Sequence, residues 1–351
     1  MSIQSRCAEP IYARQENNLS RTHTLIFSVL LLCAAASAQQ LNGAGATFPN
    51  PLYQKWFTEY GAARPKVQIN YQSLGSGAGI RQLIAGTIDF GASDAPMSDA
   101  ELAKCPTRIL HIPTAIGAVV PSYNLAGVKQ ELRFTPELLA GIFLGKITSW
   151  RDPAIAEVNP GVELPNLPIL VIHRADSSGS TYVFTDYLSK VSPEWNSKVG
   201  HAISVRWPVG PGAKGNEGVG GAIRRIDGSI GYIELTYAVQ NHISYGQVRN
   251  LKGNFVRASQ DSITAAAAPS IPQSDYRVSI TNAEGKDAYP IAGFTWLLIP
   301  QQSKDPEKGR ALHDFLAWML KDGEREAPSL TYVPLPDPMI KKLQTLIQTI
   351  H

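Results

Sequence analysis

Residues 167–188 read LPILVIHRADSSGSTYVFTDYL. The apolar run at the start of this stretch is typical of a buried strand, and the apolar side chains near its end recur at helical spacing. Between them lies a short segment rich in Ser and Gly, which begins at Arg174. The stretch therefore predicts a strand, a turn and a helix in succession, which is the repeating unit of an α/β protein.

Strand-like and helix-like segments alternate along the rest of the chain as well, which favours the α/β class throughout. Strands are expected at 67–71, 87–90, 109–113, 115–123, 229–235 and 294–299, and helices after the capping box at 98–101, from Pro136, at 308–320 and at 339–350. Residues 251–274 are rich in Ala, Ser and Pro, so we expect a loop-bearing region or a crossover between domains there.

Two more segments combine glycine with a hydroxyl residue just before a predicted helix. They are GAGATFP at 43–49 and GSGAG at 75–79. A helix N-terminus presents unpaired N–H groups and about half a positive charge, so glycine and hydroxyls there form a ready anion site. Each Ser or Thr could instead serve only as a helix N-cap. Three such loops together favour anion binding.

Arg174 and Asp94 add charge to this pattern. Arg174 follows a predicted strand, and ligands of open α/β sheets bind at the carboxyl ends of strands. Its planar guanidinium suits a tetrahedral oxyanion, although an ion pair with Asp176 is an alternative that could hold at the same time. Asp94 lies in DFGASDAP. A carboxylate beside an anion is unfavourable unless the ligand brings a proton, so a turn or cap role for Asp94 stays open.

Composition excludes several other classes of function. The chain has 351 residues, enough for about two domains, and a net charge of only +3 without a Lys/Arg run, which argues against nucleic acid as the main partner. The three cysteines and seven histidines are scattered, which predicts neither a metal site nor a disulfide framework. No P-loop or GxSxG elbow occurs, and the glycine pattern at 210–215 is expected to be a loop.

Residues 25–38 read LIFSVLLLCAAASA, an apolar run that closes on an A-x-A site. The run is shorter than the ~20 residues that span a bilayer, so residues 1–38 are expected to be a signal peptide cut after Ala38. This leader carries three Arg and two Glu, so its removal lowers the net charge from +3 to +2. The mature chain would keep Cys105 alone and could form no internal disulfide.

The chain resembles the periplasmic phosphate-binding proteins of ABC phosphate importers over nearly all of 39–351, and only 251–289 follows that family loosely. The motifs that carry the resemblance are LNGAGATFPNPLYQKW (41–56), QSLGSGAGIRQLIAGTIDFGASDAPMSD (72–99), LLAGIFLGKITSWRDPAIAEVNPGVELP (138–165), HRADSSGSTYVFTDYLSKVSPEW (173–195), WPVGPGAKGNEGVGGAI (207–223) and GSIGYIEL (228–235).

The resemblance implies a two-lobed α/β fold of the type II "Venus flytrap" kind, with a mixed sheet in each lobe. Lobe I would comprise 39–112 plus 275–351, and lobe II 113–274. The lobes would close over one phosphate without a metal or cofactor. Carried over by motif, the phosphate contacts are Thr47, Phe48 through its backbone N–H, Ser76, Asp94, Arg174, Ser178, Gly179 and Ser180. Two positions depart from the family: Ser180 replaces its usual Thr, and Ser177 stands where it often has Gly.

The resemblance also implies a role for Asp94, because phosphate at neutral pH still carries a proton to donate and sulfate does not. We expect a monomeric periplasmic receptor, not an enzyme, that delivers inorganic phosphate to the permease subunits of an ABC importer with its cytoplasmic ATPase. The alternatives are a sulfate or molybdate receptor, a secreted phosphatase, and a secreted surface protein that kept only the fold. No activated nucleophile or metal cluster in the sequence supports the phosphatase.

Overall fold

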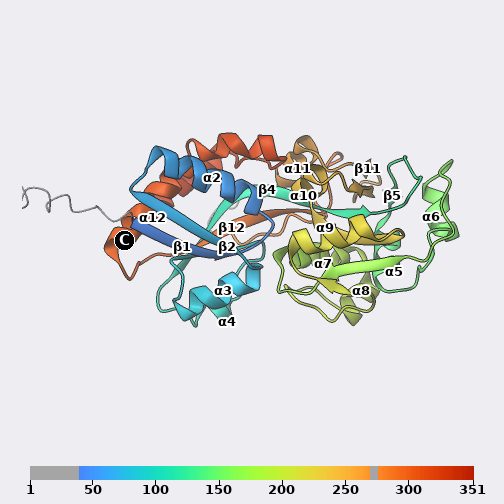
Figure 1. Cartoon of the computed structure of the whole chain (residues 1–351), viewed down its shortest axis with the longest axis horizontal. Coiled ribbons are helices and arrows are strands. Elements are labelled where there is room, and N and C mark those ends of the chain that lie inside the picture. Colours follow the sequence, from blue (N-terminus) through green and yellow to red (C-terminus); the bar gives the residue numbers. More distant parts are fainter. Residues whose placement is uncertain (1–38, 269–275) are drawn as a thin grey trace, which may run out of the picture. The chain divides into compact units, whose positions relative to one another are not determined.

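The computed structural model describes residues 39–268 and 276–351, so the expected leader lies outside the described residues. Strands and helices alternate from β1 (Gln39–Gly45) to α13 (Asp337–Ile347) (Figure 1). Among the helices of the described ranges, none combines the length and the apolar character needed to cross a membrane.

Nine strands form one mixed sheet in the order β2-β1-β3-β12-β4-β8-β6-β7, with β9 beside β4. Their bounds, after β1, are β2 (Val67–Ser73), β3 (Phe90–Ser93), β4 (Ile109–Tyr123), β6 (Leu170–Arg174), β7 (Gly212–Ala213), β8 (Ser229–Glu234), β9 (Ser244–Tyr245) and β12 (Ala292–Pro300). Strand β1 runs parallel to β2 and β3, and β6 runs parallel to β7 and β8. Strand β12 is antiparallel to both of its neighbours.

Strand β4 belongs to both halves of this sheet. Its residues 109–118 pair with β12, and its residues 119–123 pair with β8. All of its residues are buried, which matches its long apolar run. The sequence predicted two separate strands here, but β4 is continuous, and Thr114 is the extra residue at an irregularity in its pairing with β12.

Helices cover the faces of the sheet. Figure 1 shows α2 and α12 on one face of the β1–β2 half and α3 on the other. The helix bounds are α2 (Asn50–Ala63), α3 (Ser76–Ala85), α4 (Asp99–Leu102), α5 (Pro136–Phe143), α6 (Pro153–Val158), α7 (Gly179–Val191), α8 (Pro193–Lys198), α9 (Gly215–Arg225), α10 (Leu235–Gln240), α11 (Gln260–Ala267) and α12 (Pro306–Met319), with a 3-10 helix at Gly323–Leu330. Three short strands, β5 (Arg133–Phe134), β10 (Gln247–Arg249) and β11 (Phe255–Val256), form a second sheet.

One expectation about loops is wrong, and another is met in part, while the crossover between domains stays a prediction. The glycine pattern at 210–215 contains β7, and its last glycine begins α9, whose face at Val219 and Ile223 is buried. The glycines of this helix hide its amphipathic pattern, yet one of them lets the helix pack closely, since a Cβ on Gly220 would lie 3.1 Å from Ile243. The described part of 251–274 carries β11 and α11 rather than loops alone, because Ser259 and Ser262 form a capping box.

Strand β1 has no counterpart among the expected strands, because its glycines suggested a loop. Gly43 and Gly45 lie inside it, where the Phe90 ring and the Ala92 carbonyl leave no room for a Cβ. The boundaries expected for the two lobes stay a prediction. One of them, at 112/113, falls within β4, and the other, at 274/275, falls outside the described residues.

The packing of α3 against β1 generates a stability prediction. A Cβ on Gly79 would lie 2.5 Å from the Ala44 carbonyl oxygen and 2.7 Å from Gly45 Cα, both backbone atoms of the sheet. Gly79→Ala should therefore lower the free energy of unfolding by about 1–3 kcal/mol through overpacking. Gly61→Ala in α2, where nothing lies within 4 Å, should instead raise it by about 0.5 kcal/mol. Urea denaturation of both variants checks the contrast, and equal effects would contradict the packing argument.

Candidate functional site

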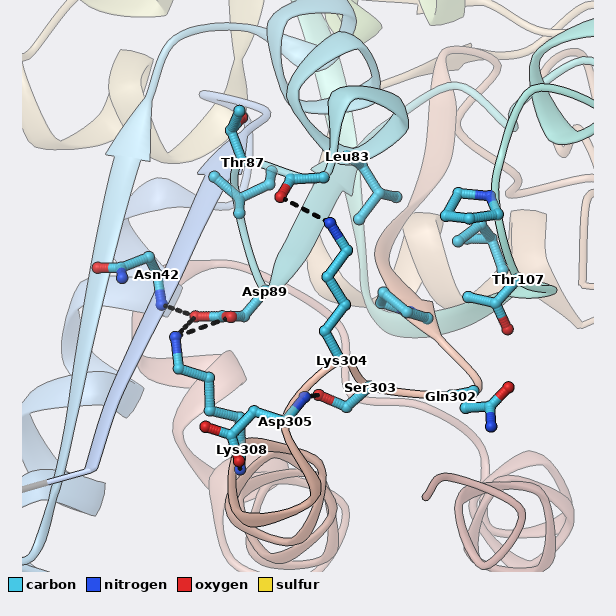
Figure 2. Close-up of a pocket in the computed structure, with 15 residues that line it drawn as sticks. Asn42, Leu83, Thr87, Asp89, Thr107, Gln302, Ser303, Lys304, Asp305 and Lys308 are labelled. Atoms are coloured by element: carbon cyan, nitrogen blue, oxygen red, sulfur yellow. Dashed lines mark hydrogen bonds and ion pairs between the residues drawn. The ribbon is translucent and has the colours of Figure 1, made fainter.

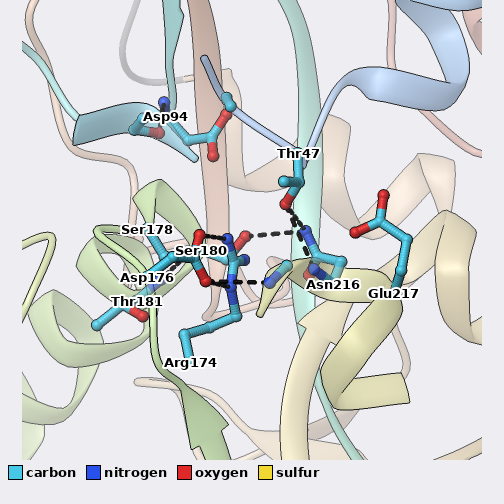
Figure 3. A network of polar contacts seen from close by, with 12 residues as sticks. Thr47, Asp94, Arg174, Asp176, Ser178, Ser180, Thr181, Asn216 and Glu217 are labelled. Atoms are coloured by element: carbon cyan, nitrogen blue, oxygen red, sulfur yellow. Dashed lines mark hydrogen bonds and ion pairs between the residues drawn. The ribbon is translucent and has the colours of Figure 1, made fainter. Parts of the chain in front are cut away.

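The expected site residues meet where strands end and helices begin. Thr47 and Phe48 follow β1, Asp94 follows β3, and Arg174 is the last residue of β6. Ser76 begins α3, and Ser178–Ser180 form the start of α7. All of these residues are buried. The loops thus gather at the carboxyl ends of parallel strands, and Figure 3 shows Asp94 and Thr47 facing the group around Arg174 and Ser180.

Gly179 lies at the point of closest approach. A Cβ on it would lie 2.4 Å from Asp94 Oδ2 and 2.5 Å from Ser76 Oγ. Any side chain at this position would therefore push apart the start of α7 and the loops that follow β3 and precede α3. The glycine is needed so that a carboxyl group, a hydroxyl and a helix N-terminus can share one small space.

Helix capping accounts for only one of the three hydroxyl–glycine loops. Ser178 caps α7 by accepting from the Thr181 N–H at 3.1 Å. The cap positions of α2 and α3 are Pro49 and Gly75, and neither helix has a side-chain cap. The hydroxyls of Thr47 and Ser76 therefore serve something other than capping.

Four buried hydroxyls of the site each accept a hydrogen bond from a protein N–H group. The pairs are Asn216 Nδ2 to Thr47 Oγ1 at 2.8 Å, Asn216 Nδ2 to Ser180 Oγ at 3.4 Å, the Asp94 N–H to Ser76 Oγ at 3.2 Å, and the Thr181 N–H to Ser178 Oγ at 3.1 Å. A hydroxyl that accepts in this way still has its own proton to donate. The arrangement is one that can surround an anion.

Arg174 is held by Asp176 in a two-pronged ion pair, which confirms the pairing expected as an alternative. Nε donates to Oδ1 at 2.8 Å and Nη2 to Oδ2 at 2.5 Å. Burial alone would raise the pKa of Asp176, but the hydrogen bonds and charge of Arg174 and the Gly215 N–H lower it overall. The remaining guanidinium nitrogen, Nη1, is buried without a hydrogen-bond partner among the described residues. A buried charged donor without a partner is unfavourable, so an anionic ligand that accepts from Nη1 would be stabilised here.

Asp94 is the unusual acid of the site. Burial raises the pKa of Asp94 to about 7, and the hydrogen bond from Thr295, the charge of Arg174 and the contact with Ser76 offset only part of this. The Thr295 hydroxyl donates to Oδ1 at 2.7 Å. In its ionised form the carboxyl group can accept a hydrogen bond from a ligand O–H.

Two tyrosines fix the backbone of the 47–48 loop. Tyr237 donates to the Thr47 carbonyl and Tyr332 to the Phe48 carbonyl, both at 2.7 Å. Within the part of the chain that the structure describes, the Phe48 N–H has no hydrogen-bond partner. The two tyrosines thus hold the carbonyls of this loop, while the Phe48 N–H stays available to a ligand.

Sequence reasoning missed Asn216, which lies at the start of α9 and contacts two of the expected site residues. It was missed because the preceding glycines were interpreted as a loop. No local pattern in the sequence marks Asn216, because both contacts join it to residues far away in the chain.

A pocket of about 410 Å³ lies elsewhere, near Asp89 before β3 and the loop that leads into α12 (Figure 2). In this pocket Lys308 pairs with Asp89 at 2.9 Å, and Lys304 donates to the Gly86 carbonyl at 3.3 Å. None of the expected site residues lines this pocket. Within residues 39–268 and 276–351 no group of three or more His, Cys, Asp or Glu side chains is placed to hold a metal.

Comparison with known proteins places this chain in a family. A model described as "PBP superfamily domain" matches residues 34–323. The phosphate-binding protein PstS of Xylella fastidiosa is 47% identical over 308 residues, covering 87% of this chain and 84% of that protein. The PstS protein of Pasteurella multocida is 44% identical over 328 residues, covering 93% and 94%. The chain belongs to the PstS family of phosphate-binding proteins.

Solved structures agree with the PstS family fold. A high-affinity periplasmic phosphate-binding protein (PfluDING) with bound phosphate superimposes with a TM-score of 0.70 at 21% identity, over 88% of this chain and 93% of that one. A putative phosphate ABC transporter substrate-binding protein from Clostridium perfringens gives 0.62 at 17% identity, over 85% and 100%. The expected two-lobed α/β fold is confirmed, and PstS is a family of substrate-binding transport proteins rather than of enzymes.

The raised pKa of Asp94 predicts a pH-dependent stability in this PstS-family chain. The folded protein holds the Asp94 proton more tightly than the unfolded chain does, because the ordinary pKa of an aspartate carboxyl group is 3.8. Stability is therefore lost as pH rises from about 4 through about 7. In phosphate-free buffer, Asp94→Asn should be more stable than the wild type by about 1–4 kcal/mol at about pH 8, and little different at about pH 4. Thermal melts across this range measure the difference. Asp287→Asn, at an exposed position, is the control, and a difference that does not change with pH would contradict the shift.

Proposed function

We propose that this chain is a phosphate receptor that binds inorganic phosphate between the loops after β1, β3 and β6 and delivers it to an ABC-type import permease. The observation that carries the proposal is the combination of one carboxyl group of raised pKa with a set of buried donors. Asp94 can accept a proton-bearing oxygen, while Arg174 Nη1 and four hydroxyls can donate to the other oxygens. The relatives named phosphate-binding protein PstS support it.

Each expected residue takes a distinct role in this proposal. Thr47, Ser76, Ser178 and Ser180 donate through their hydroxyls. Phe48 and Gly179 donate through backbone N–H groups, the latter at the positive end of α7. Arg174 supplies the charge-assisted donor, oriented by Asp176, and Asp94 is the acceptor. No metal or cofactor takes part.

Discrimination against sulfate follows from Asp94. Phosphate near neutral pH keeps a proton and can donate it to the carboxyl group, whereas sulfate is fully ionised and would meet the carboxylate with a lone pair. A site built around a ligand O–H rejects an analogue that lacks it by up to ~10⁴–10⁵-fold. A sulfate or molybdate receptor would have no use for this buried acid, so that alternative is disfavoured.

A phosphatase would need an activated nucleophile. Ser178 accepts from the Thr181 N–H and has no basic side chain among its hydrogen-bond partners, so nothing in the described part of the chain activates it. We therefore propose a binding protein without catalytic activity.

We also propose a monomer that acts in the periplasm and docks on permease subunits driven by a cytoplasmic ATPase. A solved relative in fold described as periplasmic and another described as an ABC transporter substrate-binding protein support this, together with the signal peptide expected at residues 1–38.

Isothermal titration of the mature chain tests the proposal. The protein, stripped of phosphate by unfolding and refolding, should bind one phosphate with a Kd of about 1 μM or below and bind sulfate at least ~1,000-fold more weakly. The same preparation should release no p-nitrophenol from p-nitrophenyl phosphate, with or without divalent metal ions. Equal heats from both anions, no heat from phosphate, or turnover of the ester would each refute it.

Selectivity should change when the acceptor is altered. Asp94→Asn keeps the shape of the side chain but can turn an amide N–H toward the ligand, so it should bind phosphate more weakly and sulfate more strongly. The sulfate-to-phosphate ratio of Kd values should fall by about 100-fold or more. Asp287→Asn again serves as the matched control. If sulfate stays excluded from Asp94→Asn, selectivity does not come from this carboxyl group.

A further inference from the structure

Asn216 connects two of the hydroxyls of the candidate site and is itself fully buried. It lies in the first turn of α9, and Figure 3 shows its side chain directed toward Thr47 and Ser180. Thr47 follows β1 and Ser180 begins α7, so a single amide spans residues that are far apart in the chain. Nothing in the anion-binding pattern of the sequence required an asparagine here.

The orientation of this amide follows from its neighbours. The Glu234 backbone N–H lies 3.0 Å from Oδ1 of Asn216, and a backbone N–H can only donate. The atom that faces Glu234 must therefore be the oxygen. Nδ2 is left to face the two hydroxyls, with one proton for Thr47 Oγ1 at 2.8 Å and one for Ser180 Oγ at 3.4 Å.

Thr47 is constrained further, because the backbone N–H of Asn216 also donates to its hydroxyl oxygen at 3.4 Å. A hydroxyl oxygen has two lone pairs and one proton. With two N–H groups directed at the oxygen of Thr47, both lone pairs are engaged and only its proton remains to be used. Within the described residues, the hydroxyls of Thr47 and Ser180 take part in no hydrogen bond in which they donate.

We propose that Asn216 is a positioning residue that restricts Thr47 to donating a hydrogen bond toward the bound anion and favours the same role for Ser180. The inference rests on the proposed function, since it concerns the same phosphate. It adds to the proposed function the direction in which the hydroxyl protons of Thr47 and Ser180 point. With a donor imposed at Thr47 and favoured at Ser180, a ligand oxygen that carries a proton is disfavoured there and directed to Asp94. Asn216 therefore contributes to the choice of a tetrahedral oxyanion with a single proton, without contacting it.

Two substitutions separate this role from simple packing. Asn216→Asp has nearly the same shape, but when ionised its carboxylate accepts the hydroxyl protons and turns them away from the ligand. Asn216→Ala leaves a small gap yet allows the hydroxyls to keep donating. A purely structural role would make the alanine variant the worse of the two, whereas proton direction makes the aspartate variant worse.

Phosphate titration of the whole mature chain decides between a structural role and control of the proton direction. Relative to the wild type, Asn216→Ala should bind phosphate about tenfold more weakly and Asn216→Asp about 100-fold or more at about pH 8. The Asn216→Asp deficit should shrink as the pH falls toward about 5, because the introduced carboxyl group, once protonated, can again donate to one hydroxyl. The ratio of wild-type to variant affinity at each pH removes the titration of phosphate and Asp94 from the comparison.

Asn196→Asp, an exposed position in α8, controls for the added charge and should bind phosphate as the wild type does. Thermal melts without phosphate identify a variant that fails to fold. In that case Asn216→Ala alone tests the inference, and phosphate binding within about threefold of the wild type overturns it. An Asn216→Asp variant that binds better than Asn216→Ala at every pH also overturns it. Absence of phosphate binding by the wild type would instead refute the proposed function.

Discussion

The backbone pairing of β4 with two different partners positions everything else in this protein. One end of the strand pairs with β12 and the other with β8, so two groups of parallel strands are joined through a single buried segment. Each group directs its carboxyl ends toward loops that carry hydroxyls and glycine. Because those loops are short, the positions of Thr47, Asp94 and Arg174 follow from the strands they leave. Gly179, which has no side chain, then allows the start of α7 to approach Asp94 and Ser76 closely.

The chemistry of the site depends on oriented dipoles more than on net charge. It contains the Arg174 guanidinium and the carboxyl groups of Asp94 and Asp176, and Asp176 is already paired with Arg174. A dehydrated anion must therefore be balanced mainly by N–H and O–H groups, each held by a partner that prevents it from turning away. This explains how a chain with a net charge of only +3 can provide an anion site. The bulk charge and the site are independent properties.

Local patterns in the sequence predicted the parts of this structure that local physics determines. The strand–turn–helix unit around Arg174, the pair with Asp176 two residues later, and the helix starts at Ser76 and Gly179 all follow from neighbouring residues. The structure shows β1 and α9 where glycines suggested loops, because close packing against Phe90 and Ile243 needs glycine inside regular elements. The contact of Asn216 with Thr47 joins residues far apart in the chain, which spacing alone does not reveal. The role expected of Asp94 came from the family resemblance, since the rise in its pKa depends on burial by distant segments.

The position of β12 has a consequence for how the chain folds. This strand lies in the middle of the large sheet, between β3 and β4, yet it follows them in sequence by well over a hundred residues. Until it arrives, β3 and β4 each keep an unpaired edge at the centre of the future core. A chain made from its N-terminus to its C-terminus therefore assembles the middle of its sheet almost last, and contacts of such long range make folding slow. The same strand carries Thr295, which donates to Asp94, so the acid of the site reaches its final surroundings only when the sheet is complete.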